Sequence, residues 1–256
     1  MGDMRTPPLP MVTLPLKTSH ANSLDGMPFA LCMIDTGYFG AFGLAPQGEL
    51  SKRDIGEGAL NEITLTLGAR EATAALSRQP WATRAPMLGG FDILLGSHPI
   101  GGVGGVTIDR GKKLVRFGRP SFENLAASSV VELPTKALGP NVTWSSTPTD
   151  GRVLLVVEVS IDGEVRKLVV DTGASEDVML LRSGAQSSKP IGQLRIGIVD
   201  RAGGTRSLAV DGYESPAEGF PNYRDANIAG VLGWSFLRRF RGISLDYIDA
   251  RVVLED

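Results

Sequence analysis

The sequence has very little of the chemistry that metal sites and disulfide-bonded folds require. Among 256 residues there is one cysteine, Cys32, and there are two histidines, His20 and His98. A single cysteine excludes an internal disulfide and a cysteine-cluster metal site. It lies within an apolar run at 29–34, where a small buried side chain is expected. Neither histidine has a motif around it that predicts a zinc site or a Ser-His-Asp triad, so we expect no metal and no cofactor.

Long apolar runs and blocks of like charge are also missing. No run approaches the ~18 apolar residues of a membrane span, so we expect no membrane-spanning segment. The 26 basic and 28 acidic residues leave a net charge of −2, which indicates neither nucleic acid nor an acidic membrane as a partner. The first residues do not form the basic start of a secretory signal. We expect a cytoplasmic location if Met1 is native, and a periplasmic or secreted one if a signal was removed.

Glycine and proline are abundant, with 32 and 16 residues, whereas long helical periods are scarce. This combination predicts an all-β chain with many turns. The length suffices for two lobes of roughly 100 residues each. Segments rich in aliphatic and β-branched residues predict strands, among them 63–67, 154–159, 168–170 and 194–199. The proline-rich segment 6–10 is typical of an extended arm.

Short motifs recur in the same order at a nearly constant spacing. Asp-Thr-Gly occurs at 35–37 and again 136 positions later. Three further pairs lie 137 positions apart: the Asp-Gly turns at 25–26 and 162–163, the apolar segments ending in Gly96 and Gly233, and the strand-like segments at 106–109 and 243–246. An ordered set of this kind predicts an internal repeat.

The repeat predicts two lobes, 14–118 and 153–256, each closing with a terminal hairpin at 106–117 or 243–254. Between them, prolines at 134, 140 and 148 interrupt the chain. Since proline breaks long elements, segment 119–152 is interpreted as a crossover linker.

An apolar strand that ends in Asp-Thr-Gly has a chemical logic. The strand anchors the loop, glycine permits a tight turn, and the threonine hydroxyl can bond to the backbone of a facing loop. Two such loops would leave Asp35 and Asp171 side by side. Neighbouring carboxylates share one proton, because both cannot ionise easily. One can then act as a general base on water while the other polarises a carbonyl group.

These motifs resemble those of the retropepsin-like and pepsin-like aspartic peptidases over most of residues 20–256. The match is most specific at 168–175, Leu-Val-Val-Asp-Thr-Gly-Ala-Ser, and at 230–240. The resemblance implies an all-β, two-lobed acid-protease fold, with tandem retropepsin-like lobes related by pseudo-twofold symmetry. It also implies a monomeric aspartic endopeptidase that acts on a peptide or protein substrate.

The resemblance assigns roles to seven residues of this sequence. Asp35 and Asp171 would be catalytic and would activate a water. The supporting residues of the two loops would be Thr36, Gly37, Thr172, Gly173 and Ser175, with the Ser175 hydroxyl bonded to the outer oxygen of Asp171. A hairpin flap closes over the substrate in this family, and the candidates here are 54–60 and 200–205.

The first lobe departs from the family pattern at two places. Tyr38 and Phe39 follow the first triplet, so no hydroxyl corresponds to Ser175, and loss of that hydrogen bond should raise the pKa of Asp35. After Gly96, the glycine-rich segment 97–105 is not expected to form the short helix expected at 234–240.

Two alternatives remain open. Tyr38 and Phe39 favour a pseudo-peptidase that binds a peptide or protein in the cleft without cutting it, whereas the retained Asp35 and Asp171 oppose it. A single-lobe enzyme acting as a homodimer through Asp171 is the other alternative. A second Asp loop in the same chain makes it unnecessary.

Overall fold

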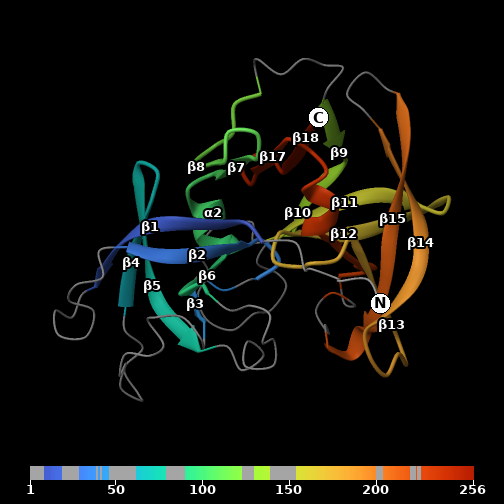
Figure 1. Cartoon of the computed structure of the whole chain (residues 1–256), viewed down its shortest axis with the longest axis horizontal. Coiled ribbons are helices and arrows are strands. Elements are labelled where there is room, and N and C mark those ends of the chain that lie inside the picture. Colours follow the sequence, from blue (N-terminus) through green and yellow to red (C-terminus); the bar gives the residue numbers. More distant parts are fainter. Residues whose placement is uncertain are drawn as a thin grey trace.

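The computed structural model describes residues 9–18, 29–38, 40, 42–45, 62–78, 90–122, 130–138, 154–199, 204–219, 223 and 226–256. Across these residues the regular structure is almost entirely β (Figure 1). The helical elements there are short: α2 (Ser97–Gly102), α4 (Trp234–Leu237) and the 3₁₀ turn η3 (Ala217–Gly219). The expected all-β class is confirmed. The proline-rich arm and the first flap candidate, 54–60, lie outside the described residues, apart from Leu9 and Pro10.

The first half of the chain forms a closed barrel, seen at the blue and teal end of Figure 1. In spatial order its described strands are β1 (Met11–Thr18), β2 (Phe29–Asp35), β6 (Ile93–Gly96), β3 (Phe42–Leu44), β5 (Arg70–Arg78) and β4 (Glu62–Leu67). The expected strand at 63–67 is confirmed as part of β4.

The second half forms a seven-stranded sheet at the other end of the molecule. Its order among the described residues is β10 (Thr135–Leu138), β11 (Leu154–Ile161), β12 (Glu164–Asp171), β16 (Gly230–Gly233), β13 (Val178–Arg182), β15 (Thr205–Pro216) and β14 (Lys189–Val199). The strands expected at 154–159, 168–170 and 194–199 are confirmed within β11, β12 and β14.

A five-stranded sheet joins the two halves. Its order is β8 (Leu114–Phe117), β7 (Gly105–Asp109), β17 (Gly242–Asp246), β18 (Arg251–Glu255) and β9 (Val130–Leu133). The two expected terminal hairpins are β7–β8 and β17–β18, and they lie edge to edge because β7 pairs antiparallel with β17. Two short strands, β9 and β10, lie inside the segment interpreted as a linker, and Pro134 separates them.

One pairing pattern occurs in both halves and places the two Asp-Thr-Gly triplets. β2 pairs parallel with β6, with Asp35 opposite Gly96. β12 pairs parallel with β16, with Asp171 opposite Gly233. The aliphatic residues just before each aspartate are almost fully buried, which is typical of parallel strands covered on both faces. Each triplet therefore begins where a buried strand ends.

The expectation that segment 97–105 forms no helix is wrong. Helix α2 spans Ser97–Gly102 and includes Pro99. Proline is tolerated there because the first N–H groups of a helix have no intrahelical partner. Ile100 is fully buried, and its packing outweighs the low helix propensity of the two glycines that follow. In the second half α4 is shorter than expected, because it ends at Leu237 and a turn covers Arg238–Phe240.

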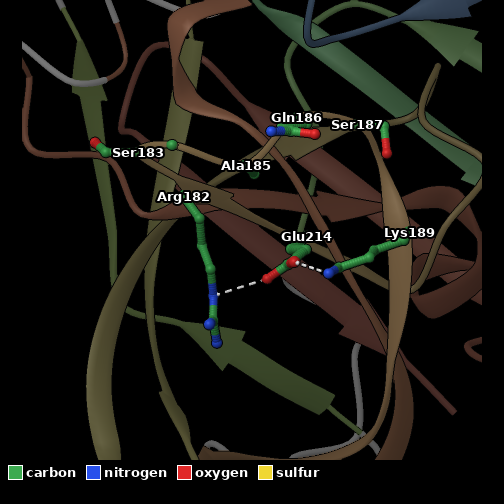
Figure 2. A pocket seen from close by; sticks show the side chains of 8 residues that line it. Arg182, Ser183, Ala185, Gln186, Ser187, Lys189 and Glu214 are labelled. Carbon is green, nitrogen blue, oxygen red and sulfur yellow. Dashed lines mark ion pairs between the residues drawn. The ribbon is translucent and has the colours of Figure 1, made fainter.

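A polar hollow of about 430 Å³ opens beside the loop between β13 and β14 (Figure 2). Its charged residues already neutralise one another in part. The Glu214 carboxylate lies 3.1 Å from both the Arg182 Nε and the Lys189 Nζ atoms. Arg182 is four residues along β13 from Val178, which pairs with Leu232 beside the second loop. At about 3.3 Å per strand residue, Arg182 lies roughly 13 Å along β13 from Val178, so the hollow is separate from the Asp loops.

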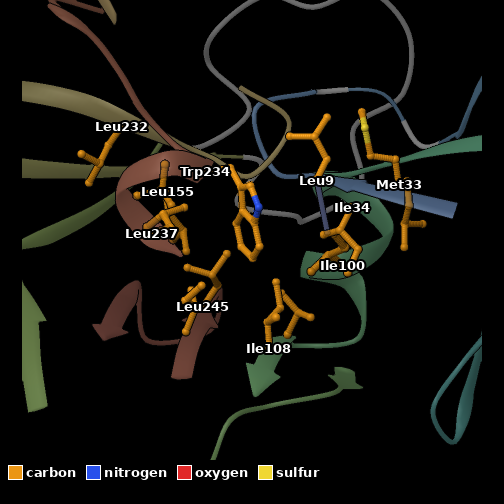
Figure 3. Close-up of a cluster of buried hydrophobic side chains, with 14 of the residues drawn as sticks. Leu9, Met33, Ile34, Ile100, Ile108, Leu155, Leu232, Trp234, Leu237 and Leu245 are labelled. Carbon is orange, nitrogen blue, oxygen red and sulfur yellow. The ribbon is translucent and has the colours of Figure 1, made fainter. Parts of the chain in front are cut away.

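The main hydrophobic core is continuous across the two halves. Trp234 of α4 lies between side chains contributed by the first half and by the second half (Figure 3). The first half contributes Ile34, Ile100 and Ile108, and the second half contributes Leu232, Leu237 and Leu245. Shared packing of this kind fixes the position of one half against the other.

No helix in the described part of the chain has the length and apolar character needed to cross a membrane.

Candidate active site

Asp35 and Asp171, the last residues of β2 and β12, lie next to each other. Their carboxyl groups are close enough for each to influence the pKa of the other. The facing glycines show how closely the loops approach. A Cβ atom built on Gly37 would lie 2.2 Å from the Asp171 carboxyl carbon, and one built on Gly173 would lie 2.4 Å from that of Asp35. Each glycine therefore makes room for the aspartate of the opposite half, as the absence of a side chain permits.

Backbone N–H groups of each loop hold one oxygen of its own aspartate. The Asp35 Oδ1 atom accepts hydrogen bonds from Gly37 N at 3.1 Å and from Tyr38 N at 2.9 Å. The Asp171 Oδ1 atom accepts equivalent bonds from Gly173 N at 2.7 Å and from Ala174 N at 3.2 Å. Both carboxyl groups are thereby oriented by the turn itself, so the order Asp-Thr-Gly fixes their direction.

The two threonines connect the loops reciprocally. The Thr36 hydroxyl donates to the Val170 carbonyl at 2.8 Å and accepts from the Thr172 N–H at 3.1 Å. The Thr172 hydroxyl donates to the Ile34 carbonyl at 2.7 Å and accepts from the Thr36 N–H at 3.2 Å. Thr36 and Thr172 are almost fully buried. Four buried hydrogen bonds thus link segments more than 130 residues apart, and breaking any one would leave a buried polar group unpaired.

The two carboxyl groups differ in their electrostatic surroundings. Burial raises the pKa of Asp35 well above its ordinary value, and the charge of Asp171 and the hydrogen bond to it raise that pKa further. Burial also raises the pKa of Asp171, but the hydrogen bond from Asp35 and the N–H groups of the loop act in the opposite direction. Because burial raises the pKa of both aspartates, the pair holds one shared proton and one negative charge near neutral pH.

A raised pKa of Asp35 was expected because the first loop has no hydroxyl that corresponds to Ser175. Burial is instead the main cause of the raised pKa.

The Tyr38 backbone retains the loop geometry. Its carbonyl accepts bonds from the N–H of Ser97 at 2.9 Å and from the Ser97 hydroxyl at 3.0 Å. In the second half the Trp234 N–H donates to the Ala174 carbonyl at 2.7 Å. The first residue of a short helix therefore supports each Asp loop.

Ser175 lies in the second loop, as its sequence position requires. Its carbonyl oxygen accepts a hydrogen bond of 2.6 Å from the Ser235 hydroxyl. The contacts of Asp171 within the described residues come from Asp35 and from backbone N–H groups of the two loops. The role assigned to the Ser175 hydroxyl stays a prediction.

The second flap candidate, 200–205, is described only at Gly204 and Thr205, at the tip of the β14–β15 hairpin. The next residue, Arg206, forms an ion pair with Asp256. This ion pair places Arg206, near the start of β15, beside the end of β18 in the five-stranded sheet.

A tyrosine outside the sequence motifs described above reaches the first Asp loop. Tyr223, between η3 and β16, is almost fully buried, and its hydroxyl lies 3.5 Å from the Gly37 carbonyl oxygen. Burial and then the charges of Asp171 and Asp35 raise its pKa. A second buried tyrosine, Tyr247, is influenced by the same three effects, also in the direction of a higher pKa. Both phenols are therefore neutral donors near the dyad.

No protein-family model matches this sequence, and no curated protein matches it either. Among solved structures, similarity was found to the crystal structure of a retropepsin-like aspartic protease from Rickettsia conorii. The two chains are 20% identical, with a TM-score of 0.28, and the match covers 44% of this chain and 94% of that protein.

Proposed function

We propose that this protein is an aspartic endopeptidase that hydrolyses peptide bonds with a water activated by Asp35 and Asp171. One observation carries the proposal: two carboxyl groups from the two halves of the chain lie side by side at the ends of buried strands, each against the glycine of the opposite loop. A solitary Asp-Thr-Gly turn would need no such partner. The reciprocal threonine bonds hold the pair in place, as preorganised catalysis requires.

A single proton shared by the pair gives the two aspartates different roles. The ionised aspartate takes a proton from the attacking water as general base. The protonated aspartate donates a hydrogen bond to the scissile carbonyl oxygen and so favours the negative charge that develops there. The proton gained by the general base can then pass to the leaving amine. Water is the nucleophile throughout, so no covalent enzyme intermediate forms.

The supporting residues act through the dyad rather than on the substrate. Thr36 and Thr172 hold the loops together, and Gly37 and Gly173 leave space for the opposite carboxyl group. The Ser175 hydroxyl would donate a hydrogen bond to the outer oxygen of Asp171.

The pseudo-peptidase alternative rested on Tyr38 and Phe39. The hydrogen bonds of the Tyr38 backbone match those of Ala174 in the other loop, so this substitution leaves the turn around Asp35 intact. No observation among the described residues favours a non-cleaving binder, and it becomes an outcome of the test.

The test is a digest of a peptide library by the wild type, Asp35→Asn and Asp171→Asn between pH 3 and 8. We expect cleavage by the wild type with a bell-shaped profile on the acid side of neutrality, since activity needs one carboxyl protonated and one ionised. Each variant should lose at least about 10³-fold in activity, because each lacks one of two unlike roles. Cleavage that persists in both variants would place the chemistry elsewhere. A wild type that binds peptides but cuts none would be a pseudo-peptidase.

A further inference from the structure

The Tyr223 side chain connects the second half of the molecule to the catalytic loop of the first. Its ring belongs to a small hydrophobic cluster of the second half, with Leu154, Val156, Val169, Ile228 and Val231. Its hydroxyl donates a long hydrogen bond, 3.5 Å, to the carbonyl oxygen of Gly37, 186 positions away in the sequence. The ring is thus fixed on one side of the junction and the polar end contacts the other.

The contacted carbonyl belongs to a peptide group that also binds Asp35. The Gly37 carbonyl and the Tyr38 N–H are the two ends of one peptide unit, and that N–H donates to Asp35 Oδ1 at 2.9 Å. Hydrogen bonds at the two ends of a peptide group polarise and strengthen each other. They also fix the plane of the peptide, and with it the direction from which the N–H approaches the carboxyl group.

Among the described residues, the arrangement is present in the first loop only. In the second loop Gly173 N and Ala174 N bind Asp171 in the same way. No side chain in the described part of the chain donates to the Gly173 carbonyl. The additional bond therefore distinguishes Asp35 from Asp171, which are otherwise held by similar turns.

We propose that Tyr223 is a positioning residue for Asp35, which it orients through the Gly37–Tyr38 peptide group. The proposal rests on the proposed function in one respect, since orientation of Asp35 affects catalysis only if the dyad is catalytic. The titratable groups that act on this site from the described elements are Asp35, Asp171, Tyr223 and Tyr247.

A matched pair of variants isolates the contact. Tyr223→Phe removes one oxygen atom and keeps the ring in its cluster. Tyr247→Phe makes the same change at the second buried tyrosine near the dyad, whose hydroxyl has no hydrogen-bond partner among the described residues. Both variants remove a neutral phenol that is influenced by the charges of Asp35 and Asp171, but only the first removes the contact with Gly37. Circular dichroism and thermal unfolding establish that each variant is folded.

The first measurement does not depend on cleavage. Carboxyl-¹³C-labelled aspartate is followed by NMR through a pH titration, and the Asp35 signal is assigned with Asp35→Asn. A hydrogen bond to a carboxylate favours its charged form, so loss of Tyr223 support should move the Asp35 titration to higher pH. Tyr247→Phe should leave it in place. An unchanged titration in Tyr223→Phe, or equal shifts in the two variants, would overturn the proposal.

The second measurement is steady-state cleavage of a peptide selected from the library. Tyr223→Phe should lower kcat by about two- to tenfold, the effect of a single neutral hydrogen bond, with KM unchanged and the alkaline limb of the pH profile moved upward. A change in KM alone would make Tyr223 a substrate contact and contradict the positioning role. A wild type that cuts nothing, combined with a shifted Asp35 titration, would refute the peptidase and leave the positioning role standing.

Discussion

Asp35 is buried with only 7% of its surface exposed, and its nearest titratable neighbour is a second carboxyl group. Burial and a like charge both penalise the ionised form. The N–H groups of Gly37 and Tyr38 compensate for part of this penalty. The arrangement is therefore maintained at a cost in stability, which is common where chemistry rather than folding determines a residue.

This cost leads to a prediction about stability and pH. The raised pKa of Asp35 means that the folded protein keeps a proton which the unfolded chain releases near pH 4. Stability is then fullest below that pH and falls as the pH rises toward the folded pKa. Asp35→Asn removes the ionisable group, so at pH 7 this variant should unfold at a higher temperature than the wild type. The difference should disappear below about pH 4, as followed by circular dichroism.

Asp109→Asn is a suitable control, because the pKa of Asp109 is lowered. The backbone N–H of Lys112 lowers it most, and the charged side chains of Lys112 and Arg241 act in the same direction. That variant should show the opposite trend, with a loss of stability at pH 7. Equal melting temperatures of the wild type and Asp35→Asn across the pH range would contradict the raised pKa of Asp35.

Much of the candidate site could be predicted because neighbouring residues in the sequence determine the structure of each Asp loop. Each Asp-Thr-Gly triplet carries its own turn, and the aliphatic residues before it indicate a buried strand. Tyr223 could not be predicted in the same way. Its contact with Gly37 spans 186 positions, and nothing in the residues around a lone tyrosine specifies which distant carbonyl it will reach.

At the scale of elements, the short helix α2 shows where local propensity and tertiary packing disagree. Glycine and proline in the segment argue against a helix, yet Ser97 supports the first Asp loop and Ile100 enters the shared core. The strands β9 and β10 were missed for a related reason. They are short, and their partners β18 and β11 lie further along the chain, so only the folded sheets provide the hydrogen bonds that define them.

If packing of Ile100 in the core holds α2 in place, Ile100→Ala should be strongly destabilising. Ile100 is fully buried, and removing such a side chain typically costs about 2–5 kcal/mol. Ile248→Ala serves as the control, because 49% of the Ile248 surface is exposed, and it should cost below about 1 kcal/mol. The free energy of unfolding in urea measures both. Similar values for the two variants would show that α2 is not held by its core contact.

At the scale of the whole molecule, one chain supplies both halves of the candidate site. The paired loops, the continuous core and the five-stranded sheet all combine residues from before and after position 140. A second copy of the chain is therefore not required to complete the dyad. We predict a monomer in sedimentation velocity, with a specific peptidase activity independent of enzyme concentration from nanomolar to micromolar. A specific activity that rises with concentration would instead indicate a dimeric enzyme.

The order of strands in the five-stranded sheet also determines when the molecule can assemble. The hairpin β17–β18 lies between β7 on one side and β9 on the other, although both flanking strands precede it in the chain. During synthesis on the ribosome, β7, β8 and β9 emerge with an unfilled gap between them, and the gap closes only after β18 has emerged. A nascent chain lacking β17 and β18 cannot form this connection between its halves. The sheet that joins them is therefore completed only after the loops and the core around Trp234 have been synthesised.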